Sequence, residues 1–271
     1  LNGKARKANM KYELNGKVAI VIGGGGSTGS AACRMLAANG AKVVVAGRTP
    51  ETLNAVVKEI TAQGGTAIAV TADVTNAESM NALVDAAVRT FGRVDAMVNC
   101  AGVRGRLEKR NPLKDYEDDL WETVIATEMT GAYHAIKAAV RQMVKQGTGG
   151  SLITVGSATG IVPIKLQCAF SAAKAGVFNF TKAVAMEMGP EKIRCNAIAS
   201  GETMNDELKA LIDAQPESAQ TIISHTPSGV LVGTDELASL ICFLVSDAAA
   251  SITGAILPVD GAWTSGYTRD F

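Results

Sequence analysis

Short apolar runs alternate with longer segments of helical period along the chain. The runs expected to form strands are rich in Val, Ile and Ala and span residues 18–23, 42–47, 66–73, 95–102, 151–158, 193–199 and 255–261. The segments expected to form helices span residues 30–39, 51–63, 77–90, 119–145, 170–189 and 235–246. Strands that are apolar throughout, each followed by a helix, predict a parallel sheet that is covered on both faces.

This order of elements predicts a single α/β domain with a doubly wound parallel sheet, the Rossmann fold, because the crossovers between parallel strands are right-handed. No linker, repeat or low-complexity segment divides the chain. We assign residues 10–271 to this domain and expect residues 1–9 to be a tag or a disordered arm. Met10 precedes the segment that leads into the first strand and is the expected native start.

The composition narrows the class of protein. Of the 271 residues, 47% are apolar and 19% are charged, so the chain can bury a sizeable core. Lys and Arg (26) balance Asp and Glu (26), which argues against nonspecific nucleic-acid binding. No apolar run approaches the roughly 18 residues that span a membrane, and the first residues do not form a signal peptide. We expect no membrane partner and a cytoplasmic location.

The five cysteines and two histidines do not form a metal or disulfide pattern. The cysteines lack C-x-x-C spacing, and most stand in apolar stretches, which favours buried thiols in a reducing compartment. His134 and His225 are far apart and have no Asp, Glu or Cys at metal-binding spacing. The sequence therefore predicts no metal site.

A glycine-rich turn follows the first predicted strand, in the sequence VAIVIGGGGSTGSAACR over residues 18–34. Gly24, Gly26 and Gly29 fit the pattern G-x-G-x-x-G between a strand and a helix. Glycines let the backbone approach a pyrophosphate, and a helix that begins near Ser27 offers amide groups and the positive end of its dipole. The hydroxyls of Ser27 and Thr28 can also donate. The turn therefore predicts a dinucleotide cofactor.

The end of the second predicted strand indicates which dinucleotide binds. A binder of NAD usually has Asp or Glu about 20 residues beyond the glycines, where it holds the ribose 2′-hydroxyl. Here Gly47 is followed by Arg48, with no carboxylate. An arginine can pair with a 2′-phosphate, which an acid would repel. The sequence favours NADP(H), although a solvated surface cation is the alternative interpretation of Arg48.

With these and later motifs, the chain resembles the short-chain dehydrogenase/reductase family from about Leu14 to Gly261. The matching segments are IGGGGSTG (22–29), Asp73-Val74, NCAG (99–102), GSLITVGSATG (150–160), AFSAAKAG (169–176), IRCNAIASG (193–201) and a helix–turn–strand segment over 234–262. The resemblance implies an oxidoreductase, with a small-molecule substrate and a dimeric or tetrameric assembly.

The resemblance also implies roles for individual residues. Ser157 and Lys174 match catalytic positions, Phe170 stands at the position of the family's catalytic Tyr, and Glu128 stands where the family usually has a catalytic Asn. Residues expected to bind the cofactor are Gly23, Gly26, Ser27, Thr28, Gly29, Arg48, Asp73, Val74, Asn99, Ala101, Gly102, Lys174, Ser200, Gly201 and Thr203.

Phe170 is the departure from the family pattern with the largest chemical consequence. In the family, the tyrosine hydroxyl exchanges a proton with the substrate, and a lysine one helical turn away lowers the pKa of the phenol from its usual value of about 10. Phe keeps the ring but removes this proton donor, which commonly contributes about 10²–10⁴ to the rate. Ile22, Ser27 and Ser200 depart from the family pattern as well.

Two origins of Phe170 remain open: a Tyr-to-Phe change that impairs a ketoreductase, or natural divergence towards other chemistry. Glu128 favours divergence. Dienoyl-CoA reductases, a branch of the family, also lack the tyrosine and reduce a conjugated C=C bond, and Glu128 would act there directly or through water while Lys174 and Ser157 polarise the carbonyl. Glu128 could instead be a structural partner of Lys174. A non-redox dehydratase or isomerase and an NADP-binding pseudoenzyme are further alternatives.

A cluster of basic residues follows NCAG and bears on the substrate. Arg104, Arg106, Lys109 and Arg110 stand in a segment that family geometry places beside the mouth of the active site. Such a cluster could receive a carboxylate, a phosphate or the tail of coenzyme A. A solvated loop is the alternative, and Glu108 dilutes the positive charge.

Overall fold

The computed structural model describes residues 12–103, 111–214 and 223–266. The expected tag or arm over residues 1–9 and the basic cluster from Arg104 to Arg110 therefore lie outside the described residues.

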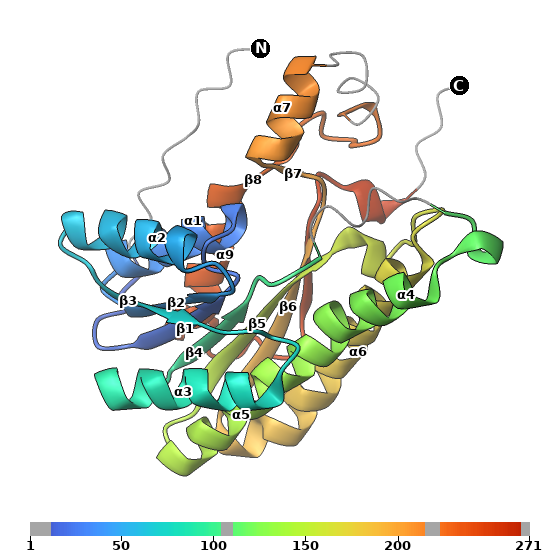
Figure 1. Ribbon diagram of the computed structural model, residues 1–271. Helices are drawn as coiled ribbons and strands as arrows, with labels where there is room; N and C mark the ends of the chain where they lie inside the picture. The colour runs from blue at the N-terminus through green and yellow to red at the C-terminus, as the bar shows by residue number, and fades with distance from the viewer. Residues whose placement is uncertain (1–11, 104–110, 215–222, 267–271) are drawn as a thin grey trace.

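A parallel sheet of seven strands forms the centre of the molecule (Figure 1), in the order β3-β2-β1-β4-β5-β6-β9. The register pairs Ile22 of β1 with Ala46 of β2 and with Asn99 of β4, so the carboxyl ends of these strands meet at one edge. The strands are β1 (Val18–Ile22), β2 (Lys42–Gly47), β3 (Thr66–Thr71), β4 (Ala96–Asn99), β5 (Gly150–Ser157), β6 (Ile193–Ser200) and β9 (Ile256–Val259).

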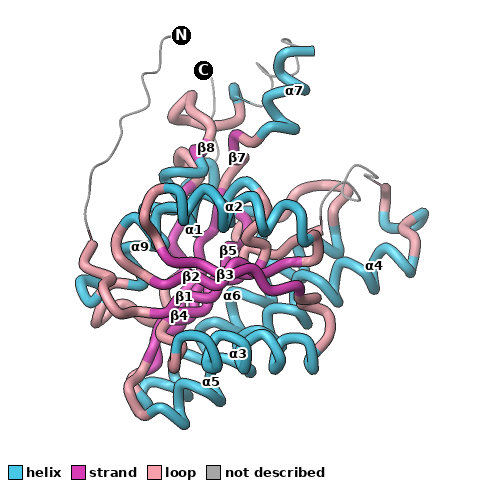
Figure 2. Tube along the Cα trace, turned by 60° about the vertical axis from the view of Figure 1, so that its left-hand side comes forward, coloured by secondary structure: helices cyan, strands magenta, loops and turns pink. Residues whose placement is uncertain are grey.

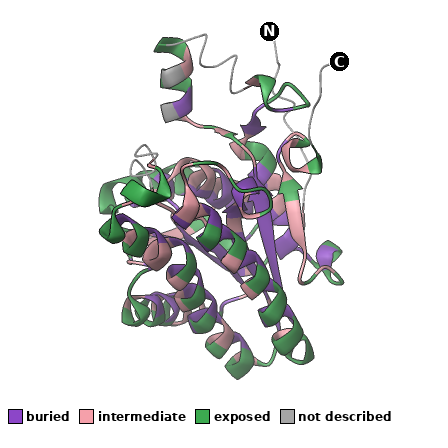
Figure 3. Ribbon diagram, turned by 90° about the vertical axis from the view of Figure 1, so that its right-hand side faces the viewer, coloured by how far each residue is buried: buried purple, intermediate pink, exposed green. Residues whose placement is uncertain are grey.

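Helices cover both faces of the sheet, as Figures 1 and 2 show. One face carries α1 (Ser27–Ala38), α2 (Pro50–Ala62) and α9 (Thr234–Val245), and the other carries α3 (Ala77–Phe91), α5 (Gly131–Gln146) and α6 (Cys168–Met188). Alternate β1 side chains enter two different cores: Ala19 and Val21 pack on the first face, Ile20 and Ile22 on the second. This explains why β1 is apolar and buried at every position. Figure 3 colours the inner strands of the sheet as buried.

Shorter elements lie mostly at the edges of the sheet. They are η2 (Leu113–Asp115), α4 (Asp118–Val124), η3 (Ile125–Thr130), η4 (Ala158–Gly160), η5 (Gly189–Glu191), β7 (Thr203–Met204), α7 (Asp206–Ala214), β8 (Val232–Gly233), η6 (Asp247–Ala249) and η7 (Trp263–Ser265). β7 and β8 pair as a small separate sheet. Figure 1 places them, with α7, above the carboxyl ends of the central strands.

The Rossmann fold and the single domain are confirmed. The segment 119–145 is helical throughout, as predicted, but it is not a regular α-helix, because a π-helical segment, η3, separates α4 from α5. The predicted strand over 95–102 ends at Asn99, whose side-chain oxygen accepts a hydrogen bond from the backbone N–H of Ala101 at 3.1 Å and turns the chain. None of the described helices is long and apolar enough to cross a membrane.

All five cysteines are free thiols. Cys33, Cys195 and Cys242 are buried, whereas Cys100 and Cys168 are partly buried. Burial raises the pKa of Cys195 and of Cys242 to about 12, so both side chains are neutral at physiological pH.

Candidate active site

The glycine-rich turn after β1 depends on the absence of side chains at two of its positions. Gly23 has φ of +74°, and a Cβ atom there would lie 2.7 Å from the carbonyl oxygen of Cys100. A Cβ atom on Gly29 would collide with the carbonyl oxygen of Gly23. Helix α1 begins at Ser27 as expected, with Gly26 as its N-cap. The turn is therefore held against the end of β4 while its backbone stays free to approach a ligand.

Replacing Gly23 by Ala is expected to destabilise the protein more than the same change at Gly92. Both glycines have positive φ, at +74° and +84°, but a Cβ atom on Gly92 has nothing within 4 Å. Gly92→Ala should lower the free energy of unfolding by only about 1–2 kcal/mol, the strain of an alanine in the left-handed conformation. Gly23→Ala must also move backbone, so its loss of unfolding free energy in urea should exceed that of Gly92→Ala. Equal losses would show that the contact with Cys100 carries no weight.

A cavity of about 230 Å³ opens beside this turn, at the carboxyl edge of the sheet. Its lining joins the ends of four adjacent strands, β3, β2, β1 and β4, to η3. Residues predicted from the sequence to bind a cofactor supply much of this lining, namely Gly23, Gly26, Arg48, Asp73, Val74, Ala101 and Gly102. Gly25, Thr49, Thr52, Thr75, Cys100 and Thr127 also line it, although the sequence analysis did not select them.

Arg48 and Asp73 are the two ionisable cavity residues that the sequence analysis singled out. Arg48 is exposed and makes no ion pair with another described residue. The pKa of the Asp73 carboxyl lies below its usual range, chiefly because it accepts a hydrogen bond from the backbone N–H of Thr75 at 2.9 Å. The hydroxyl of Thr75 and the charge of Arg48 lower the pKa of Asp73 further. Asp73 is therefore ionised and fixed at the cavity wall.

The other residues selected from the sequence lie nearby but outside the lining of this cavity. Ser27, Thr28 and Gly29 form the first turn of α1, and Asn99 ends β4. Ser200 ends β6, and its hydroxyl lies 2.8 Å from that of Thr203, which donates to the carbonyl of Gly201 at 3.1 Å. These last three residues stand on the far side of β5 from the cavity, again at the carboxyl edge.

Lys174 and Glu128 form a buried ion pair. The Lys174 Nζ atom lies 2.7 Å from the Glu128 Oε2 atom, and the two side chains are only 7% and 2% exposed. The Oε1 atom of Glu128 accepts a hydrogen bond from the backbone N–H of Val103 at 2.8 Å. The Lys174 Nζ atom also lies 5.3 Å from the centre of the Phe170 ring, within the range of a cation–π contact.

The π-helical segment η3 positions Glu128. A π helix widens the turn, and such insertions often occur at functional sites. In η3 the adjacent residues face two parts of the site: Thr127 lines the cavity, while Glu128 reaches Lys174 on α6. A Cβ atom on Gly102 would lie 3.1 Å from Glu128 Oε1, so the carboxylate packs directly against the cavity lining.

Ser157 is the last residue of β5 and pairs in register with Ser200 of β6. Its hydroxyl oxygen accepts a hydrogen bond from the backbone N–H of Thr159 at 3.3 Å, in η4. Lys174 packs beneath this segment, since a Cβ atom on Gly160 would lie 2.9 Å from the Lys174 carbonyl oxygen. The structure therefore gathers Phe170 and Glu128 around the Lys174 ammonium, and it places Ser157 at the start of η4, which packs against α6.

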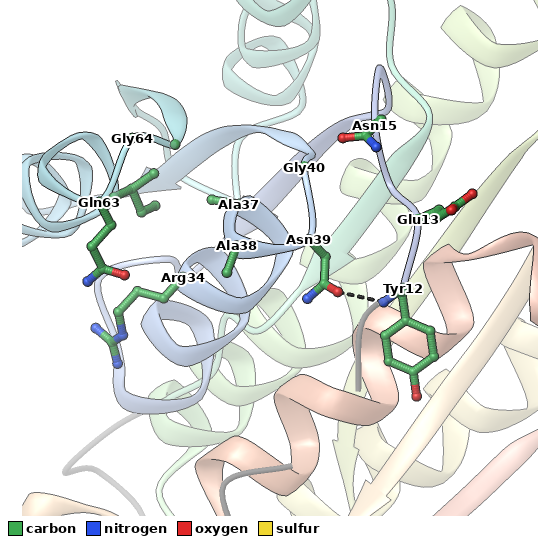
Figure 4. Close-up of a pocket in the computed structure, with 12 residues that line it drawn as sticks. Tyr12, Glu13, Asn15, Arg34, Ala37, Ala38, Asn39, Gly40, Gln63 and Gly64 are labelled. Carbon is green, nitrogen blue, oxygen red and sulfur yellow. Dashed lines mark hydrogen bonds between the residues drawn. The ribbon is translucent and has the colours of Figure 1, made fainter. Parts of the chain in front are cut away.

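A larger cavity, of about 610 Å³, lies away from these residues (Figure 4). It is lined by the carboxyl ends of α1 and α2 and by residues Tyr12, Glu13 and Asn15. The backbone N–H of Tyr12 donates there to Asn39 Oδ1 at 2.6 Å. The ends of α1 and α2 lead into the amino ends of β2 and β3, so this cavity is at the opposite edge of the sheet from Lys174. No residue selected from the sequence lines it.

A doubly wound sheet with a glycine turn after its first strand is typical of nicotinamide-dependent oxidoreductases. Sequence comparison identifies the family. The family model described as Enoyl-(Acyl carrier protein) reductase matches residues 24–264. An L-rhamnose 1-dehydrogenase (NAD(P)(+)) of Azotobacter vinelandii is 38% identical over 249 residues, covering 90% of this chain and 95% of that protein. The chain belongs to the short-chain dehydrogenase/reductase family.

Further similar proteins are reductases and a dehydrogenase by name. A 3-oxoacyl-(acyl-carrier-protein) reductase of Synechocystis is 38% identical over 251 residues, covering 92% of this chain and 97% of that protein. The crystal structure of levodione reductase superposes with a TM-score of 0.86 at 30% identity, over 93% of this chain and 99% of that one. NAD⁺-bound xylitol dehydrogenase gives a TM-score of 0.85 at 29% identity, over 92% and 99%.

Proposed function

We propose that the protein is an NADP(H)-dependent oxidoreductase that interconverts a carbonyl compound and its alcohol, with the Lys174–Glu128 pair in place of the missing tyrosine hydroxyl. The observation that carries this proposal is the buried ion pair itself, 2.7 Å long and in contact with Phe170. Keeping two charges buried is costly unless they are paired. The pair lies where the family has its proton donor. Lys174 could therefore supply the proton that the tyrosine supplies in the family.

The residues at the carboxyl edge fit a dinucleotide. Cβ atoms at Gly23, Gly24 and Gly25 would collide with Cys100, Val45 and Thr52, so the glycines let the turn lie close against these neighbours beside the start of α1. Backbone N–H groups at the start of a helix bind phosphate oxygens. When bound, the nicotinamide cofactor supplies or accepts hydride. Asp73 would hold the adenine end, while Asn99, Ser200 and Thr203 would border the nicotinamide end.

Ser157 and Lys174 would hold the reacting oxygen of the substrate. During reduction, the substrate carbon gains a hydride and its oxygen gains a proton. The Lys174 ammonium would release that proton to the oxygen and become a neutral amine beside the Glu128 carboxylate, and solvent would then restore the proton to the amine. Glu128 fixes the ammonium through Oε2 while Val103 fixes Glu128 through Oε1. Positioned acid–base groups of this kind commonly contribute about 10²–10⁴ to a rate.

Arg48 supports NADP(H) over NAD(H), because it lines the cavity at the end of β2, where an acid would hold the ribose of NAD. Arg48→Ala should raise the KM for NADPH about 10- to 100-fold, because one charge-assisted hydrogen bond of about 1.5–3 kcal/mol is lost. The KM for NADH should stay nearly unchanged. Steady-state kinetics with both cofactors measure this. Arg34→Ala is the control, since the Arg34 side chain also reaches the surface but pairs with Glu59 beside the other cavity. A preference for NADH in the unaltered protein would refute the assignment.

Reduction of a conjugated C=C bond is the second candidate, and Phe170 favours it. In that reaction the proton goes to carbon, so a phenol beside the oxygen is not required, while Ser157 and Lys174 would stabilise the enolate. NADPH consumption with a panel of ketones, alcohols, enones and enoyl thioesters separates the candidates. Consumption with saturated ketones supports the leading proposal, and consumption with enones alone supports the second. Cofactor binding without consumption would favour non-redox chemistry or a nucleotide-binding role.

A further inference from the structure

Phe170 belongs to an apolar cluster that extends from the catalytic residues towards solvent. The buried members of this cluster are Leu120, Val124, Ala169 and Ala173. The partly buried members packed against it are Val103, Tyr116, Ile125 and Phe170. These side chains come from the connection after β4, from α4 and η3, and from the start of α6. We name the four partly buried members the apolar wall.

Exposed apolar side chains also stand on segments at the same edge of the sheet as this wall. They stand on the segments that follow β4, β5 and β6, three strands that are neighbours in the sheet. Together they form what we name the apolar rim: Leu113 (76% exposed), Ile161 (42%), Val162 (40%), Met204 (39%) and Val230 (64%). Exposed apolar groups that gather at one place mark a site where a ligand or partner binds.

Among the described residues, the charge that faces Phe170 belongs to the balanced Lys174–Glu128 pair. Burial raises the pKa of the Tyr116 phenol, and the nearby Cys168 raises it further, so Tyr116 is neutral at physiological pH. Its hydroxyl has no hydrogen-bond partner among the described residues, which leaves a neutral donor at the wall. Other charged residues on these segments are exposed to solvent: the Lys114 and Asp115 side chains are 81% and 60% exposed and lie 3.9 Å apart, and Lys165 is also exposed.

We propose that the substrate is a largely apolar, uncharged molecule whose hydrocarbon body lies on the apolar wall and rim while its oxygen reaches Ser157 and Lys174. The proposal rests on the proposed function for the location of the reacting oxygen. The continuity of the wall with Phe170 argues for a small substrate as the occupant, because Phe170 touches the Lys174 ammonium through its ring. The loss of the phenol makes this surface more apolar beside the reacting group.

The binding of a homologous series of alcohols tests the proposal without turnover. The protein with saturating NADPH is titrated calorimetrically with 2-alkanols from 2-butanol to 2-octanol, which cannot react with the reduced cofactor. Burial of one CH₂ group is worth about 0.8 kcal/mol, so the dissociation constant should fall up to about fourfold per added carbon. Hydroxycarboxylates of the same length, with a carboxylate at the far end, should bind more weakly than the matching alkanols.

Variants with matched exposure connect the binding to the rim. Val162→Thr keeps the volume of the side chain but adds a hydroxyl, and it should weaken 2-octanol binding by at least about twofold because that hydroxyl must be desolvated. Val144→Thr is the control, since Val144 is a valine of equal exposure, 41% against 40%, near the carboxyl end of α5. The control should bind like the unaltered protein.

Several outcomes would overturn the proposal. They are a dissociation constant that does not change with chain length, tighter binding of the carboxylates, no binding of any member of the series, and equal effects of the two valine variants. If Val162→Thr changes the oligomeric state by light scattering but not the binding, the rim is instead an interface between copies of the chain. A separate titration with NADPH alone tests the cofactor assignment. The alkanol series is then repeated on the protein without cofactor, so that alkanol binding is measured independently of NADPH. Failure of the proposed function can thus be told from failure of this inference.

Discussion

Replacing Glu128 by Gln is expected to lower the free energy of unfolding by about 3–5 kcal/mol, because it leaves a buried ammonium without its counter-charge. Gln preserves the size of the side chain and can still accept the hydrogen bond from Val103, so the loss reports mainly on the charge facing Lys174. Urea unfolding followed by circular dichroism measures it.

A matched change at the surface provides the control. Glu59 also pairs with a cation, since its Oε2 atom lies 3.0 Å from Arg34 Nη1, but both side chains are exposed, at 53% and 39%. Glu59→Gln should therefore cost only about 0–1 kcal/mol. Adding Lys174→Met to Glu128→Gln should recover much of the lost stability, because no unpaired charge then remains buried. A Glu128→Gln protein as stable as Glu59→Gln would show that the pair is not effectively buried.

Replacing Phe170 by Tyr is expected to change the rate of ketone reduction by less than about tenfold, although it restores the residue usual in the family. A lysine lowers the pKa of a phenol when its charge is available. Here the Lys174 charge is already balanced by Glu128, 2.7 Å away, so a phenol at position 170 should keep a pKa near 10 and remain a poor acid–base group.

The double change Phe170→Tyr with Glu128→Asn should behave differently. Asn removes the balancing charge and restores the arrangement usual in the family, so the rate should exceed that of Glu128→Asn alone by about 10²–10⁴-fold. Steady-state kinetics with NADPH and a ketone of the panel measure both variants. A large increase with Phe170→Tyr alone would mean that Glu128 does not compete for Lys174, and that the chain is an otherwise intact ketoreductase with one missing hydroxyl.

The fold could be predicted almost fully from the sequence, because strands buried on both faces leave a direct signal. Val43, Val44 and Val45 are consecutive and all fully buried. Three apolar residues in a row are typical of a parallel strand whose two faces are both covered by helices. The exception is the segment from Asp118 to Gln146, whose period is helical throughout. The π turn at η3 inserts into that period without a glycine or proline to mark it, so the sequence predicted one helix.

The position of the candidate residues at one edge of the sheet could be predicted, but the contacts between them could not. The glycine pattern and the helix spacing from Phe170 to Lys174 selected residues that the fold brings to the carboxyl edge, and their roles stay predictions. The direct contact of Glu128 with Lys174 was only one of several alternatives, since it depends on the π turn. The Val103 N–H that fixes Glu128 and the Tyr116 ring beside Phe170 had no sequence signal, because a backbone donor and an isolated tyrosine carry none.

The rate of a single turnover in the Glu128→Gln protein tests most directly whether the Lys174–Glu128 pair replaces the tyrosine. Enzyme in excess is mixed with NADPH and a ketone that the unaltered protein reduces, under conditions where circular dichroism shows the variant folded, and the loss of NADPH absorbance is followed. We predict that Glu128→Gln slows this step by about 10²–10⁴ while NADPH affinity and the rate of Glu59→Gln stay unchanged. An unchanged rate in folded Glu128→Gln protein would contradict the account and return Glu128 to a purely structural role.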